Sequence, residues 1–397
     1  MRYDLVIIGA GPAGAATALG ALSANPSLSV AMLDRADFPR DKACGDGIAP
    51  HVVDLLATAG VTGLMADQVP VRRLRLERGG LGVDRPMSRP AWVVPRTVFD
   101  ARLVDAARAA GADLVRHRVR HLHHRADSVV LDESVEARVV VGADGVHSVV
   151  RREIGSATGP VAVAMRGYAP TPSDRSGAQV IVFGTERPAS YAWSFDRGDG
   201  TANVGYGELQ TSRDRRPTRA QLLDQLETLL PGATTGGHDW RGQLLPLSTW
   251  RGPRRGSGRV LLAGDAAGLV NPMTGEGIFY AVATGLHAGR AAAAALAVDG
   301  GASAASRQAP LDRALLAGHL RHTHLAAALC RSGTVLDAGL RAAAADQDVF
   351  DDLVELGLAT GRITATMGRG LLKAAPAVLT ARRASTDHIE ETPACAS

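Results

Sequence analysis

Three glycines near the N-terminus have the spacing of a turn that binds phosphate groups. Gly9, Gly11 and Gly14 follow a short apolar run, residues 4–8, which is typical of a buried β-strand. In such a turn the first glycine permits the tight bend, the second lets the backbone approach a pyrophosphate, and the third lets a helix pack closely on the strand. The small residues that follow predict that helix, whose free N–H groups and partial positive charge would face the phosphates.

An acidic residue stands where the ribose of a nucleotide would need it. A second apolar run, residues 29–33, ends in Asp34, roughly 20 residues beyond the turn. A carboxylate here accepts hydrogen bonds from ribose hydroxyls and repels a 2′-phosphate. Strand, glycine turn, helix, strand and acid together predict a site for FAD or NAD rather than NADP. The alternative is an ordinary strand–turn–helix without a ligand.

Two later segments have related patterns. A buried strand at residues 139–141 runs into a Gly-Ala-Asp-Gly turn, in which Asp144 can cap the next helix or accept a hydrogen bond from a cofactor. A strand near residue 260 ends in Gly264 and Asp265, and the turn at residues 271–277 opens a long alanine-rich helix. Backbone N–H groups at this helix start would stabilise the negative charge of a reduced flavin.

Composition excludes several classes of protein. The chain has 397 residues, of which 46% are hydrophobic and 21% charged, so we expect a globular protein with two or three structural units. A net charge of +4 does not indicate nucleic-acid binding. We expect no membrane-spanning run, no signal peptide and a cytoplasmic protein. The histidines near residues 121–124 do not have metal-ligand spacing, so we expect no metal site.

The pattern of elements changes twice along the chain. Strand-like runs dominate from about residue 160 to residue 247 and predict an antiparallel sheet, while the chain beyond residue 300 reads as helices. We therefore predict an α/β fold: a Rossmann-like FAD-binding domain with a parallel sheet and helices, an antiparallel substrate domain, and a C-terminal helical region. The predicted segments are 1–70 with 95–155 and 255–300 for the first domain, 71–94 with 156–254 for the second, 301–385 for the helical region, and 386–397 for a disordered tail.

Some features have two interpretations. The basic amphipathic segment at residues 363–383 predicts either membrane-surface docking or a helix packed on the protein. Tyr191, Trp193 and Tyr206 are candidates for an apolar substrate wall or for core aromatics. Cys44 lies in a polar, glycine-rich loop after the second strand, where it is either a group near the flavin or a small buried residue.

The three glycine motifs, in this order, resemble the p-hydroxybenzoate hydroxylase superfamily of FAD enzymes. Within it, the loop at residues 38–47, the Tyr-Ala-Trp-Ser-Phe run at 191–195 with Ala-Asn-Val-Gly at 202–205, and the Asn-Pro-Met-Thr-Gly-Glu-Gly-Ile run at 271–278 resemble the geranylgeranyl reductase family, including its menaquinone-reductase branch. This chain departs from the usual family motif at Asp196, which stands where proline is frequent. A flavin halogenase is disfavoured because its Trp-x-Trp-x-Ile-Pro motif is absent.

The resemblance extends the set of candidate site residues. It implies that Val119 contacts the adenine through its backbone. The candidate cofactor-binding residues are Gly9, Gly11, Ala13, Gly14, Asp34, Arg35, Cys44, Gly45, Gly47, Arg96, Val119, Asp144, Gly264, Asp265, Pro272, Gly275, Gly277 and Ile278.

The resemblance also implies a reaction, the reduction of carbon–carbon double bonds in an apolar isoprenoid-type substrate by hydride from reduced FAD. Because an unactivated alkene also needs a proton, Cys44, or a water held near it, is the candidate catalytic acid. The electrons would come from NAD(P)H or from a separate reductase or ferredoxin acting as a redox partner. The alternative is an FAD-dependent monooxygenase or epoxidase that acts through a flavin C4a-hydroperoxide.

Overall fold

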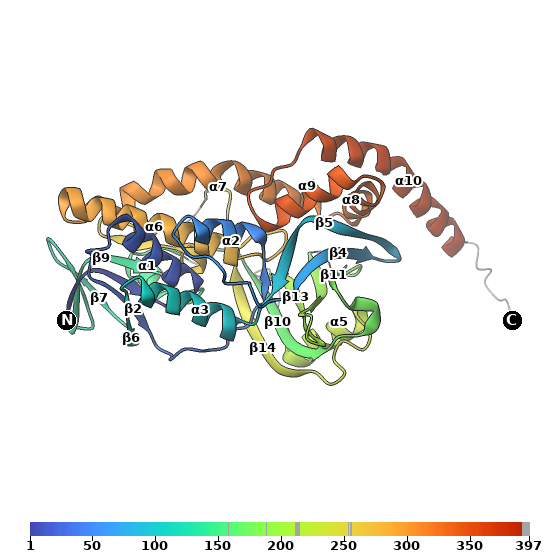
Figure 1. Ribbon diagram of the computed structural model, residues 1–397. Helices are drawn as coiled ribbons and strands as arrows, with labels where there is room; N and C mark the ends of the chain where they lie inside the picture. Colours follow the sequence, from blue (N-terminus) through green and yellow to red (C-terminus); the bar gives the residue numbers. More distant parts are fainter. Residues whose placement is uncertain (158, 188, 211–214, 253, 255, 391–397) are drawn as a thin grey trace.

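Two sheets and a set of C-terminal helices make up the molecule (Figure 1). The structure is a computed structural model that describes residues 1–390 apart from 158, 188, 211–214, 253 and 255. The predicted α/β fold with a parallel sheet, an antiparallel sheet and a C-terminal helical region is confirmed.

The first sheet joins segments from the beginning, middle and later parts of the chain. Its strands are β1 (Arg2–Ile8), β2 (Val30–Asp34), β6 (Asp113–Arg116), β7 (Leu122–His124), β8 (Val129–Leu131), β9 (Val135–Gly142) and β15 (Val260–Leu262). β1 pairs in parallel with β2 on one side and with β9 on the other, β6 continues beyond β2, and β15 also pairs in parallel with β9. The antiparallel strands β8 and β7 form the other edge. The carboxyl ends of β1, β9 and β15 therefore meet at one edge of the sheet.

Helices cover this sheet and pack on one another unusually closely. They are α1 (Pro12–Ala24), α3 (Arg96–Ala109), the short α4 (Val149–Glu153) and α6 (Ile278–Asp299), with α2 (Pro50–Ala57) beside α6. The contact between α1 and α6 is made by small residues: a Cβ added at Gly289 would lie 2.1 Å from the carbonyl oxygen of Thr17. By length and composition α6 is apolar enough to cross a membrane, contrary to our expectation, but 72% of that window is buried inside the protein.

The second sheet is mainly antiparallel. Its strands are β3 (Gly47–Ile48), β4 (Pro70–Arg78), β5 (Leu81–Val93), β10 (Val161–Pro170), β11 (Ala178–Phe183), β12 (Ser190–Asp196), β13 (Thr201–Gln210) and β14 (His238–Pro246). They follow the order β14-β10-β13-β12-β11-β4-β5-β3, and only the β4–β11 pair among them is parallel. The helix α5 (Arg219–Leu229) packs on one face, where Tyr206 and Leu226 belong to a common core.

The C-terminal helices run along the molecule and join the two sheets (Figure 1). They are α7 (Ala304–Leu329), α8 (Gly333–Ala345), α9 (Gln347–Leu358) and α10 (Ala365–Glu390). α7 packs on α6, whereas α8 and α9 pack on β5 and share a core with it that includes Leu74, Leu340 and Phe350. Residues 386–390 of the predicted disordered tail belong to α10, and residues 391–397 lie outside the described residues.

We predict that Gly289→Ala destabilises the protein while Gly368→Ala does not. Gly289 has no room for a methyl group against α1, and overpacking of this kind costs about 1–3 kcal/mol of unfolding free energy. Gly368, in α10, has nothing within 4 Å of the added Cβ, so alanine there should be neutral or stabilising by up to about 1 kcal/mol. Chemical denaturation measures both, and equal stability of the two variants would contradict the close α1–α6 contact.

Candidate functional site

One large cavity lies between the two sheets and the C-terminal helices. Its volume of about 1760 Å³ exceeds the roughly 300–1,000 Å³ of an ordinary small-molecule pocket, so it has room for a cofactor and a substrate together. Every candidate cofactor-binding residue lines it except Gly14 and Gly264. These two lie just behind the wall, where added Cβ atoms would meet the carbonyl oxygen of Gly9 at 1.8 Å and the Cβ of Ala13 at 3.1 Å.

The first glycine turn presents an open helix start to the cavity. Gly9 has a φ of +97°, and its added Cβ would lie 2.4 Å from the carbonyl oxygen of Ala143, so only glycine fits there. α1 begins at Pro12 with Gly11 as its N-cap, and no side chain caps it and no acid occupies its first turn. Its N-terminal N–H groups are therefore available to a phosphate, as the motif predicts.

Asp34 is held at the edge of this crevice by the backbone. Its carboxylate oxygens accept hydrogen bonds from the N–H groups of Ala10 at 2.9 Å and Ala36 at 3.0 Å. Arg40, which we did not predict, crosses the same crevice, 3.1 Å from the position of a Cβ on Gly11 and 3.3 Å from Asp100. A guanidinium beside an uncapped helix start suits a pyrophosphate. Val119 lines the cavity just beyond β6, which ends at Arg116.

The second motif contributes a carboxylate with a free oxygen. Asp144 follows β9, and one of its oxygens accepts from the N–H of Val149 at 2.6 Å at the start of α4, as the capping interpretation predicts. Its other oxygen is buried without a hydrogen-bond partner among the described residues. Burial raises the pKa of this carboxyl. A buried acceptor on the cavity wall fits a hydroxyl donor such as the ribityl or ribose groups of FAD.

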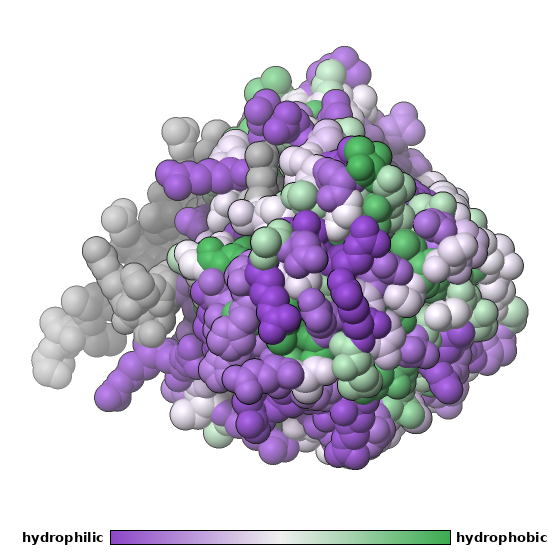
Figure 2. Space-filling model, turned by 90° about the vertical axis from the view of Figure 1, so that its left-hand side faces the viewer, coloured by the Kyte–Doolittle hydropathy of each residue, from purple (hydrophilic) through white to green (hydrophobic). Residues whose placement is uncertain are grey.

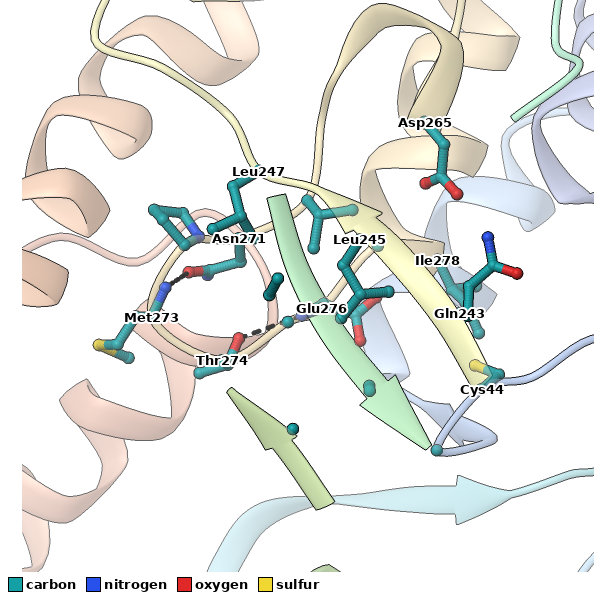
Figure 3. A pocket seen from close by; sticks show the side chains of 18 of the residues that line it. Cys44, Gln243, Leu245, Leu247, Asp265, Asn271, Met273, Thr274, Glu276 and Ile278 are labelled. Atoms are coloured by element: carbon teal, nitrogen blue, oxygen red, sulfur yellow. Dashed lines mark hydrogen bonds between the residues drawn. The ribbon is translucent and has the colours of Figure 1, made fainter. Parts of the chain in front are cut away.

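The third motif is fixed to the C-terminal helices. Asp265 follows β15 and lies 3.1 Å from the ammonium group of Lys42. In the turn before α6, Asn271 donates to the carbonyl oxygens of Leu356 and Gly357 in α9, each at 3.2 Å, and accepts from the N–H of Met273 (Figure 3). The position of this turn therefore depends on α9, which is far away in the sequence.

The aromatic motif holds the Cys44 loop in place. Trp193 donates from its indole N–H to the side-chain oxygen of Asn203 at 2.9 Å. The amide nitrogen of Asn203 then donates to the carbonyl oxygen of Cys44 and to the carboxylate of Asp46, both at 2.8 Å. Tyr168 donates to the same carboxylate at 2.6 Å, while burial raises the pKa of Asp46 to about 6. The second sheet thus fixes the loop backbone on one side of the cavity.

Two of the three predicted substrate-wall aromatics line the cavity. Tyr191 and Trp193 do so, and Tyr191 also donates to the carbonyl oxygen of Thr274, which ties β12 to the third motif. The prediction for Tyr206 is wrong: it is fully buried among the core residues beside α5, and its hydroxyl donates to Glu208 at 2.9 Å. Side chains alternate along β13, so the strand that turns Asn203 towards Cys44 turns Tyr206 to the opposite face.

Asp196 does not disturb the cavity. Asp196 stands where the family motif has proline. Its carboxylate accepts hydrogen bonds from the N–H groups of Gly177 and Gly198 at 2.7 and 3.1 Å, and from the hydroxyl of Thr171 at 3.0 Å. This cluster lies at the end of β12, and none of its four residues lines the cavity.

Two acids with raised pKa values face the cavity near the third motif. Cys44 and Glu276 both line it, together with Ile278 and Gln243 (Figure 3). Burial raises the pKa of the Cys44 thiol, although the positive charge of Arg96 opposes the shift. Glu276 accepts from the N–H of Phe279 at 2.7 Å, yet burial still raises its pKa to about 7. Both groups can therefore carry a proton near neutral pH.

An apolar wall continues from this point. It is formed by side chains from β4 and β11 and from the C-terminal helices, including Leu76, Ile181, Leu336, Leu340, Leu353 and Met367. No charged ligand would be satisfied against this wall, whereas a hydrocarbon chain would be.

Sequence reasoning missed Arg40, Lys42, Asn203 and Glu276. The sequence did contain a pattern that could have identified Glu276: it is the one acid in a turn that otherwise has no charged residue and that precedes a helix. Asn203 was noticed only as part of a motif, and its role depends on contacts with a loop more than 150 residues away.

We predict that Asn203→Ala weakens FAD retention while Asn25→Ala does not. The first change leaves the carbonyl oxygen of Cys44 and the Trp193 N–H without partners, at a cost of about 1–3 kcal/mol each, and so loosens the wall that contains Gly45 and Gly47. Asn25 is half-buried at the end of α1, and its side chain accepts only from the N–H of Ser27 in a local turn. Equilibrium titration of the apoprotein with FAD should show about a tenfold or greater loss of affinity for the first variant alone. Equal affinities would contradict this role.

Comparisons with known proteins agree with this geometry. Residues 2–307 match the family model described as an FAD binding domain. The menaquinone reductase of Mycolicibacterium smegmatis is 34% identical over 319 residues, which cover 72% of this chain and 75% of that protein. The geranylgeranyl diphosphate reductase of Rhodobacter capsulatus is 32% identical over 318 residues, which cover 75% of this chain and 76% of that protein.

The fold also has a close counterpart among solved structures. A geranylgeranyl bacteriochlorophyll reductase-like protein from Thermoplasma acidophilum superposes with a TM-score of 0.75 over 96% of this chain and 98% of that one, at 20% identity. That identity supports the fold alone, whereas the family match and the two relatives bear on function. The chain belongs to the FAD-dependent oxidoreductases of the geranylgeranyl and menaquinone reductase group.

Proposed function

We propose that this chain saturates carbon–carbon double bonds in an isoprenoid lipid. The observation that carries the proposal is the continuity of the cavity: one lining combines the glycine motifs with the apolar wall built by the second sheet and α8 and α9. FAD, when reduced, supplies the hydride for such a reaction. The apolar wall would hold the hydrocarbon chain and keep water away from the reacting carbons.

The protein itself would supply the proton. Cys44 and Glu276 are the two candidates, because both line the cavity near the third motif and both have a raised pKa (Figure 3). Glu276 is the better candidate of the two at neutral pH, because its pKa of about 7 lies near the working pH, where a general acid is most effective. Cys44, with its pKa raised by burial, is the weaker acid and would position or exclude water.

The source of electrons would be transient. The sequence carries one nucleotide fingerprint, at Gly9–Gly14 with Asp34, and the family match assigns it to FAD. We therefore propose that NAD(P)H or a separate reductase or ferredoxin reduces the flavin without a permanent site on this chain.

Mass spectrometry of the product tests the reaction. Photoreduced enzyme incubated without oxygen should add pairs of hydrogens to geranylgeranyl diphosphate, to a digeranylgeranyl glycerophospholipid or to menaquinone. The control is oxidised enzyme under the same conditions, which should leave the substrates unchanged. A product that has gained one oxygen and forms only in air would contradict the proposal and indicate a monooxygenase.

Variants at the two acids test the proton source. If Glu276 donates the proton, the rate constant for double-bond reduction should fall as the pH rises through about 7, because its carboxyl group then loses the proton that it would donate. Glu276→Gln should lower the rate at pH 6 by about 10²-fold or more and abolish this pH dependence. Cys44→Ser should retain the pH dependence. If instead Glu276→Gln keeps the wild-type rate and profile with a full complement of FAD, Glu276 is not the acid.

A further inference from the structure

An exposed patch of apolar and basic side chains borders the cavity. We call it the rim patch; its members are Trp250, Arg251, Arg321, Leu325, Leu329 and Arg331. Trp250 is 61% exposed, and Leu325 and Leu329 are 44% and 39% exposed. Trp250, Leu329 and Arg331 also line the cavity, so the cavity meets the solvent at this patch. Large apolar side chains at such a place indicate contact with another apolar phase.

The patch has a fixed shape. The Trp250 ring lies 5.3 Å from the ring of His324 in α7, and a ring nitrogen of His324 is 2.8 Å from the carbonyl oxygen of Ser248. These contacts hold the loop against the helix. On α7 itself Arg321, Leu325 and Leu329 are four residues apart and therefore share one helix face.

The charge of the patch is positive and uncompensated. Arg251, Arg321 and Arg331 have no carboxylate partner within the part of the chain that the structure describes. The two stretches that carry the patch, residues 250–251 and 321–331, contain three arginines and no aspartate or glutamate. Anionic groups are thus attracted to this edge of the cavity.

Exposed apolar residues elsewhere differ from those of the rim patch. Val298, at the end of α6, is 69% exposed and Leu372, in α10, is 76% exposed, yet neither lines the cavity. On the face of the molecule seen in Figure 2, which is the end formed by the first sheet, hydrophilic residues predominate and hydrophobic ones occur in separate patches. The rim patch is distinguished by the combination of tryptophan, leucines and free arginines at a cavity edge.

We propose that the rim patch docks on the surface of an anionic lipid bilayer and opens the cavity towards it. Tryptophan and leucine enter the boundary between headgroups and acyl chains, and arginines pair with lipid phosphates. This inference rests on the proposed function, because a lipid substrate then passes from the bilayer to the apolar wall without crossing water. An acidic protein could also bind the arginines, but binding of such a partner would not explain why leucines are exposed beside the cavity.

Vesicle co-sedimentation tests the docking with the full-length, FAD-loaded protein. We expect binding to vesicles of phosphatidylcholine mixed with phosphatidylglycerol, weak binding to phosphatidylcholine alone, and loss of binding at high salt. The double variant Arg321→Glu with Leu325→Glu should lose about tenfold or more in vesicle binding, and the matched control Val298→Glu should not change. Unchanged melting temperature and FAD content would show that the variants fold.

Contrary outcomes are equally clear. If Leu372→Glu abolishes vesicle binding and the double variant does not, α10 is the membrane-binding element and the proposal is wrong. The proposal is also wrong if the protein binds an acidic protein but binds none of the vesicles. A second readout is quenching of tryptophan fluorescence by brominated lipids, which should occur in the wild type and disappear in Trp250→Phe. Of the other three tryptophans, Trp193 is buried, and Trp92 and Trp240 are half-buried and packed on the cores.

These measurements separate the docking from the proposed function. Reduction of a detergent-dispersed substrate by the double variant at the wild-type rate, with loss of vesicle binding, supports both. Vesicle binding by an enzyme that adds no hydrogens to any isoprenoid would overturn the proposed function alone. Reduction of dispersed substrate by a wild-type enzyme that ignores all vesicles would overturn the docking alone.

Discussion

The parallel pairing of β1, β9 and β15 is the constraint on which the site depends. Ile8 pairs with Gly142, and Gly142 pairs with Leu262, so the three strands end level with one another. Each is followed by a turn rich in small residues, and their backbones touch: the carbonyl oxygen of Ala143 occupies the space that a Cβ on Gly9 would need. Segments more than 100 residues apart therefore form one wall of a single cavity.

The other walls are coupled to this one by side chains with partners in distant segments. Asn203 connects β13 to the Cys44 loop, and Asn271 connects the third motif to α9. Tyr191 connects β12 to the same motif through the carbonyl oxygen of Thr274. Because each tie is a hydrogen bond to a backbone carbonyl, a shift of the second sheet or of α9 would move one wall of the cavity relative to the others.

Sequence patterns predicted the fold and the glycine-rich wall well, for a physical reason. Gly9, Gly14 and Asp34 act through local backbone geometry, which the residue types themselves determine. Tyr206 was misassigned because aromatic character alone does not show which face of a strand lines the cavity and which packs in the core. The register set by Asn203 would have resolved it, since residues 203 and 206 point to opposite faces.

Other parts of the site lie beyond local pattern. The alanine- and leucine-rich sequence after residue 300 predicts helices, but it does not predict that α8 and α9 close the cavity. That closure depends on the packing of the two helices against β5. The proton-carrying role proposed for Glu276 likewise arises from burial, which only the assembled fold creates. Arg40 reaches the first crevice from a loop. The path of a loop cannot be predicted from the sequence, because loops lack the regular side-chain period of helices and strands.

The most direct test of the central claim is a crystal structure of the protein with FAD and an isoprenoid bound. The account predicts the pyrophosphate at the start of α1 beside Arg40, the flavin ring between the Cys44 loop and the turn at residues 271–277, and the hydrocarbon chain along the apolar wall. Density for the ring outside that space, or for the hydrocarbon outside the cavity, would contradict it.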